Sequence, residues 1–106
     1  MKKTEYVRGS GNVFADLGLP NAEELLAKAS LATKIIEEIQ RRELTQTQAA
    51  RILGIDQPKV SALKQGRLEG FSIERVMRLL LRLGRDIEIS VHEKSRSRSH
   101  AHLHVA

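Results

Sequence analysis

The stretch from Leu44 to Gly66, LTQTQAARILGIDQPKVSALKQG, carries the signals of two short helices joined by a tight turn. Thr45 and Gln48 have the spacing of a capping box, in which each side chain bonds the backbone N–H of the other residue at a helix start. Gly54 then ends this first helix, because glycine can take the left-handed conformation that a sharp stop requires. The local signals therefore predict a helix, a turn and a second helix.

The predicted second helix has one apolar and one polar side. Asp56 can cap it, and Pro58 is tolerated in a first turn whose N–H groups have no helical partner. Val60 and Leu63 are three residues apart and therefore face inward together. The side chains left facing outward are Gln57, Lys59, Ser61, Lys64 and Gln65. A short helix with this outward face is suited to a polar partner.

The same stretch resembles the helix-turn-helix of the phage-repressor (Cro/repressor, or XRE) family. The positions that carry the resemblance are Gln46, Ala50, Gly54, Ile55, Val60 and Leu63. It implies a mostly α, lambda-repressor-like bundle of about four helices that regulates transcription by binding double-stranded DNA. An ordinary αα-hairpin also needs a small residue and a turn glycine, and it is the alternative reading of the stretch.

The resemblance implies that the family's usual DNA-contact positions are occupied by Gln46, Gln57, Lys59 and Ser61. Lys64 and Arg67 are expected to anchor the DNA backbone. The side-chain amide of Gln57 carries both a hydrogen-bond donor and an acceptor, so it can read adenine. The ammonium group of Lys59 can donate to guanine. The start of the first helix is suited to a phosphate, because its free N–H groups and its dipole favour an anion. The predicted DNA-binding residues are Thr45, Gln46, Gln57, Pro58, Lys59, Ser61, Lys64 and Arg67. Pro58 departs from the family, which often has a polar residue there, and it removes a possible donor.

The charge distribution points to the same partner. The 106-residue chain has a net charge of +5, and residues 41–67 hold six basic and two acidic residues, a net +4. Such clustering is expected of a surface that faces DNA. Aromatic residues make up only 3% of the chain, which argues against stacking recognition of single strands. We therefore expect a double-stranded DNA operator as the partner.

The composition argues against several other classes of protein. There is no cysteine, so disulfides and thiolate metal sites are excluded. No apolar run approaches the roughly 18 residues of a membrane span, and the N-terminus lacks the apolar region of a signal peptide. No paired carboxylates, activated nucleophile or phosphate loop is visible, and all four histidines follow residue 91. We expect a cytoplasmic protein that is not an enzyme and binds no cofactor or metal.

Residues 21–42 are predicted to form one long amphipathic helix capped by Asn21. Its apolar positions recur at spacings of three and four: Ala22, Leu25, Leu26, Ala29, Ala32, Ile36 and Ile39, with Leu31 and Ile35 widening the stripe. Residues 11–29, GNVFADLGLPNAEELLAKA, resemble the N-terminal segment of HigA-type antitoxins. That resemblance implies the antitoxin of a type II toxin–antitoxin pair, with a RelE/HigB-like toxin as partner. The alternatives are a stand-alone XRE-type regulator and a scaffold that has lost DNA binding.

Two segments after the helix-turn-helix predict a homodimer. Residues 73–83 form a helix that is apolar on more than one face, and a second subunit is the natural cover for the extra face. Residues 86–92 alternate strictly and predict a strand, whose backbone groups need a partner. We expect this strand to pair with its copy across a two-fold axis. The predicted dimerisation residues are Val76, Leu80, Leu83, Ile87, Ile89 and Val91.

The chain is predicted to have three parts. Residues 1–11 form a flexible N-terminal arm, residues 12–93 the DNA-binding and dimerisation domain, and residues 94–106 a disordered basic tail. A two-fold dimer presents two recognition helices. Its operator should therefore be an inverted repeat, with half-site centres about 34 Å apart.

Overall fold

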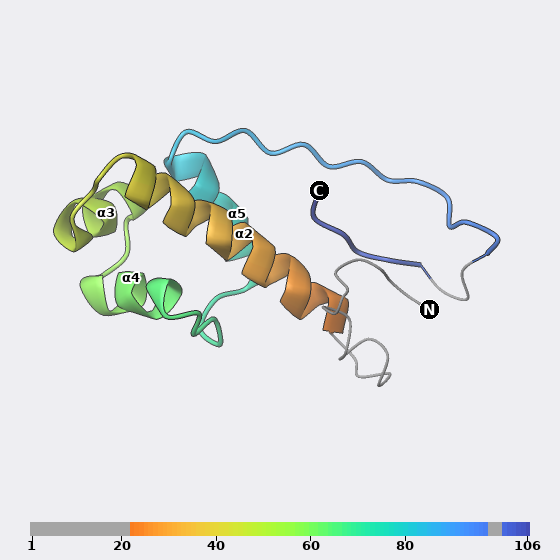
Figure 1. Ribbon diagram of the computed structural model, residues 1–106, viewed down its shortest axis with the longest axis horizontal. Helices are drawn as coiled ribbons and strands as arrows, with labels where there is room; N and C mark the ends of the chain where they lie inside the picture. Colours follow the sequence, from red (N-terminus) through yellow and green to blue (C-terminus); the bar gives the residue numbers. More distant parts are fainter. Residues whose placement is uncertain (1–21, 98–100) are drawn as a thin grey trace. The chain divides into compact units, whose positions relative to one another are not determined.

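The computed structural model describes residues 22–97 and 101–106 and contains four helices in this part of the chain. They are α2 (Ala22–Arg41), α3 (Gln46–Leu53), α4 (Gln57–Lys64) and α5 (Ile73–Arg82), and Figure 1 shows α3 and α4 next to each other. None of these helices combines the length and the apolar composition needed to cross a membrane. The predicted N-terminal arm, and the capping role given to Asn21, lie outside the described residues.

The chain divides into two units. One is Lys28–Glu88, which holds α3, α4, α5 and most of α2, and the other combines the two ends of the chain. In the second unit, Glu23 accepts a hydrogen bond from the backbone N–H of Leu103 at 3.1 Å and also contacts His102 Nδ1. The tail therefore touches the first turn of α2 through one carboxylate.

The long helix α2 confirms the prediction for residues 21–42, but its buried stripe differs from the predicted one. The buried apolar residues are Ala22, Ala27, Leu31, Ala32, Ile35 and Ile39. Leu25 is 51% exposed, Ala29 is exposed, and Ile36 is only half-buried. Apolar residues occur on more than one side of this helix, so spacing alone could not select the side that packs.

Helices α2 and α5 are joined near both ends, and they run in the same direction. Near the start of α5, Lys28 Nζ donates to the carbonyl oxygens of Phe71 at 2.8 Å and Leu68 at 3.2 Å. Just past its end, Arg42 Nη2 donates to the carbonyl oxygen of Leu83. These bonds join the two ends of α5 to α2 of the same chain.

Three of the six predicted dimerisation residues are buried within the chain itself. Val76 is 0%, Leu83 1% and Leu80 3% exposed, because α5 buries these side chains in the core of its own chain. They do not form a free surface for a second subunit. On the same helix, the large apolar side chain that is exposed is Leu81, at 55%.

The segment after α5 is extended but forms no strand among the described residues (Figure 1). Ile89 is 75% and Val91 89% exposed, whereas Ile87 is half-buried. A strand is defined by its pairing with a neighbour, so the pairing of residues 86–92 stays a prediction.

A buried carboxylate lies where the ends of α2 and α5 meet. Glu38 is 4% exposed, and its oxygens contact the guanidinium groups of Arg41, of Arg42 at 2.6 Å and of Arg85 at 3.4 Å. The hydrogen bond from Arg41, with a further one from Arg42, lowers the pKa of Glu38 from 4.5 to about 2, although burial acts in the opposite direction. Glu38 therefore stays ionised and fixes the helix ends to each other.

Candidate nucleic-acid interface

Helix α3 begins as the sequence predicts. Gln48 N donates to Thr45 Oγ1 at 3.1 Å, and Thr45 N donates to Gln48 Oε1 at 2.8 Å. Both halves of the capping box are thus present. The box fixes the first turn of α3, and with it the direction in which Gln46 and Thr47 leave the backbone.

The turn between α3 and α4 depends on Gly54. Its φ of 72° is left-handed, a conformation that a residue with a Cβ takes only at a cost. A Cβ at this position would also lie 3.1 Å from Arg82 Nη2. Arg82 crosses the turn from the last turn of α5 and donates from Nε to the carbonyl oxygen of Ile52 at 3.0 Å. The turn is therefore set by a glycine within it and by an arginine from outside it.

Helix α4 buries one face and exposes the other. Val60 is 0% and Leu63 2% exposed, and Ala49 and Leu53 on the neighbouring α3 are also buried. Asp56 caps the helix, since its Oδ1 accepts from Lys59 N at 3.0 Å. The inward and outward faces predicted for residues 57–65 are therefore those of the structure.

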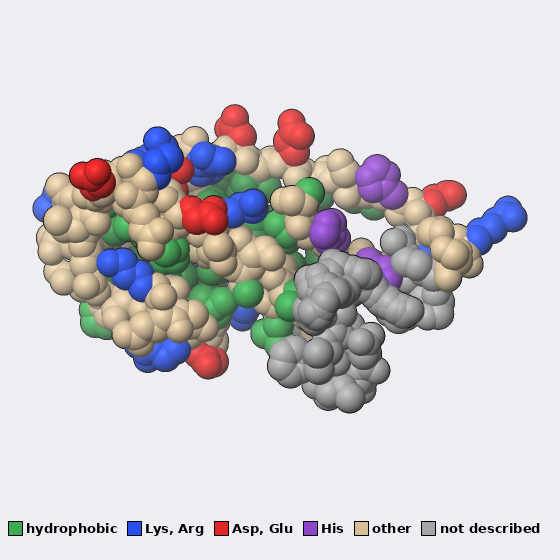
Figure 2. Space-filling view, in the orientation of Figure 1, with side chains coloured by type: hydrophobic (Ala, Val, Ile, Leu, Met, Phe, Trp, Pro, Cys, Tyr) green, Lys and Arg blue, Asp and Glu red, His purple; other side chains and the backbone are tan. Residues whose placement is uncertain are grey.

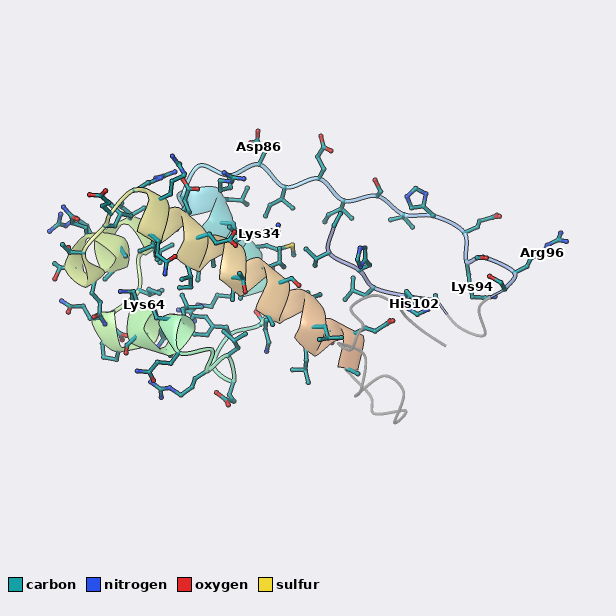
Figure 3. All side chains as sticks on the ribbon, in the orientation of Figure 1. Lys34, Lys64, Asp86, Lys94, Arg96 and His102 are labelled. Carbon is teal, nitrogen blue, oxygen red and sulfur yellow. The ribbon has the colours of Figure 1, made fainter. Side chains whose placement is uncertain are left out.

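The predicted contact residues lie on the polar surface of α3 and α4 or beside it. Thr45, Gln57, Pro58, Lys64 and Arg67 are exposed, while Gln46, Lys59 and Ser61 are half-buried. Figure 3 labels Lys64 at the end of α4, and Figure 2 shows basic side chains spread over this part of the surface. Asp56 remains within 3.9 Å of Lys59 Nζ, so one acidic group belongs to the same surface.

Hydrogen bonds among these side chains order the surface. Arg67 Nε donates to Gln65 Oε1 at 2.9 Å, and Gln65 Nε2 donates to Ser61 Oγ at 3.4 Å. At the other end of α4, Gln46 Nε2 donates to the carbonyl oxygen of Gln57 at 2.9 Å. At each end of α4, predicted DNA-binding residues therefore take part in hydrogen bonds within the protein before any ligand binds.

The charge of the surface is smaller than the sequence count implies. Arg41 and Arg42 contribute to the net +4 of residues 41–67, but both contact Glu38, which lies outside that range. The basic residues on α3, on α4 and directly after α4 are Arg51, Lys59, Lys64 and Arg67. These four supply the positive charge of the helix-turn-helix itself.

Comparison with known proteins gives an independent result. A family model described as a helix-turn-helix domain matches residues 13–92. A solved structure of a protein assigned as an XRE family transcriptional regulator is 49% identical, with a TM-score of 0.77, and the match covers 82% of this chain and 98% of that one. This chain belongs to the XRE-type helix-turn-helix family. A comparison with curated proteins finds no match.

In this XRE-type chain, the family predicted from Gln46, Ala50 and Gly54 is therefore confirmed. Sequence reasoning missed Thr47, which contacts the site residue Gln57, and Arg82, which contacts the turn before α4. Gln57 Nε2 donates to Thr47 Oγ1 at 3.2 Å. The position of Thr47 beside Gln46 at the helix start was a usable signal, whereas nothing local connects Arg82 with a turn about 30 residues earlier.

Proposed function

We propose that this XRE-type protein is a DNA-binding transcriptional regulator that inserts α4 into the major groove. The observation that supports the proposal most directly is the polar outer face of α4 over a buried inner face of Val60 and Leu63. A major groove is wide enough to admit one α-helix, and the N-terminal residues of a recognition helix lie nearest the bases.

The proposal gives the exposed residues separate roles. Gln57 and Lys59 read base edges, with Ser61 as a further contact to base or backbone. Thr45 and Gln46 place the positive end of α3 on a phosphate. Lys64 and Arg67 anchor the DNA backbone without reading sequence. Pro58 is exposed in the first turn and offers only an apolar contact.

We also propose that the protein represses as a homodimer on an inverted repeat. Support comes from Ile89 and Val91, which alternate along an extended segment and expose most of their surface. Paired antiparallel with its copy, this segment would bury both side chains and satisfy its backbone groups. Two recognition helices about 34 Å apart would then meet successive turns of the duplex.

The test is binding to duplex DNA. The purified chain is used to select from a randomised duplex library, and its affinity for the selected sequence is measured against salt concentration beside a scrambled duplex. Gln57→Ala should lose about 1–3 kcal/mol of discrimination at one base step in each half-site. No preference between the selected and scrambled duplexes would overturn the proposal.

A second pair of variants separates backbone anchoring from general charge. Lys64→Ala should weaken binding to both duplexes and reduce the slope of log K against log salt by about one unit for each bound α4. Lys34→Ala removes the same charge from the exposed side of α2, outside the helix-turn-helix, and is the matched control (Figure 3). An equal loss of slope in both variants would contradict the role given to Lys64.

The antitoxin role rests on the HigA-type resemblance of residues 11–29, most of which lie outside the described residues. We propose it as the regulator's second activity, with a RelE/HigB-like toxin as partner. Co-expression with the product of the adjacent gene tests it: a stable complex and relief of growth arrest are expected. A neighbouring gene product that neither binds nor arrests growth favours the stand-alone regulator.

A further inference from the structure

We infer that Thr47 determines base specificity by positioning Gln57, without touching a base itself. The inference rests on the proposed function, in which Gln57 reads the major groove. Thr47 is exposed in the first turn of α3, and its Oγ1 accepts a hydrogen bond from Gln57 Nε2 at 3.2 Å. The bond joins two helices across ten residues of sequence.

Two consecutive residues of α3 hold Gln57 at two different points. Gln46 Nε2 donates to its backbone carbonyl oxygen at 2.9 Å, and Thr47 accepts from its side chain. The capping box of Thr45 and Gln48 fixes the turn from which both holding residues project. The backbone of Gln57 is thus fixed by one bond and the direction of its amide by the other.

The bond to Thr47 leaves Gln57 able to pair with adenine. Pairing with adenine needs one N–H donor to N7 and one carbonyl acceptor for the N6 amino group. An amide nitrogen carries two N–H groups, so one can stay on Thr47 while the other donates to the base. Within residues 22–97 and 101–106, the structure gives the side chain of Gln57 no hydrogen bond other than the one to Thr47.

Holding the amide in advance improves discrimination because less freedom is lost when the base is bound. A glutamine side chain that is free in solution must be ordered at the moment of binding, which weakens the specific complex. Non-specific complexes depend mainly on phosphate contacts and do not require this order. Removing the hydroxyl of Thr47 should therefore weaken specific binding and leave non-specific binding unchanged.

The experiment compares Thr47→Val, which has nearly the same shape without the hydroxyl, with Thr47→Ser, which keeps it. The probe is the duplex selected by the wild-type chain from a randomised library, together with single base-pair variants of it. For Thr47→Val we expect discrimination to fall by about two- to tenfold at the base pair read by Gln57. Thr47→Ser should retain the discrimination of the wild type. Both variants should match the wild type in thermal unfolding and in affinity for a scrambled duplex.

A double-mutant cycle separates positioning from a purely structural role. In the Gln57→Ala background, Thr47→Val should have no further effect on discrimination, because no amide is left to position. An equal loss of discrimination in both backgrounds would overturn the inference, as would a loss of affinity that is uniform over all duplexes.

The inference and the proposed function can fail separately. Wild-type discrimination that depends on Gln57 but survives Thr47→Val would overturn this inference alone. A wild-type chain that selects no sequence would overturn the proposed function and this inference with it.

Discussion

The helix-turn-helix of residues 45–65 and the extended segment of residues 86–92 have equally clear sequence patterns. Within the part of the chain that the structure describes, only the helix-turn-helix finds its partners. Val60 of α4 is 0% exposed, whereas Val91 of the segment is 89% exposed. The caps of α3 and α4 are made by residues three positions apart, and their apolar sides meet each other. An alternating pattern, in contrast, predicts a strand that must pair with a neighbour, but it does not identify the chain that supplies this neighbour.

The largest expected effect tests whether the segment is completed by a second copy. Ile89→Asp should prevent dimer formation, because burying an unpaired carboxylate in an apolar interface costs several kcal/mol. Ser90→Asp adds the same charge to the other side of the proposed strand and is the control. Light scattering coupled to size exclusion measures the mass of both variants. A wild-type chain that is monomeric at all concentrations would remove the basis of the dimer.

The same substitution at a valine in each region compares their contributions to the free energy of unfolding. Val60→Ala should lower the free energy of unfolding by about 2–3 kcal/mol, through lost apolar burial and the cavity left behind. Val91→Ala, at a concentration where the chain is monomeric, should change it by less than about 0.5 kcal/mol. Urea denaturation followed by circular dichroism measures both. Equal losses would mean that residues 86–92 pack within a single chain.

Gly54→Ala tests how strictly the turn is set. We expect a loss of about 1–2 kcal/mol in the free energy of unfolding, because alanine is strained at a φ of 72° and its Cβ would crowd Arg82. Gly70→Ala is the control, since a Cβ there meets nothing within 4 Å and its φ is not left-handed. Denaturant midpoints of the two variants give the comparison. Equal stability of both would show that the turn tolerates a side chain.

The largest change with pH should come from Glu38. Its pKa is lowered from 4.5 to about 2, so its ionised form contributes stability above pH 4.5 that is lost as the pH falls toward 2. The difference in free energy of unfolding between the wild type and Glu38→Gln should shrink over this range. Glu37→Gln, an exposed carboxylate on the same helix, is the control. A difference that stays constant from pH 6 to pH 2 would contradict the ion-pair role.

The sequence alone determined the elements whose signals are local. Thr45 with Gln48, Gly54, and Asp56 with Lys59 act within a few residues of each other, so their spacing sufficed to place α3, the turn and α4. The outward face of α4 followed from the period of a helix, and with it most of the candidate site. The family was predicted because the small, apolar and glycine residues of this stretch occupy the positions that the family's helix-turn-helix requires.

Only the tertiary structure decided which side of α2 is buried, what covers α5, and which distant residues support the site. Leu25 and Leu31 are the same residue type on the same helix, but Leu25 is 51% exposed and Leu31 is 8% exposed. Arg82 reaches Ile52 over 30 residues, and Arg85 reaches Glu38 over 47. Such contacts depend on how helices cross in space, and that arrangement leaves no periodic trace in the sequence of any one helix.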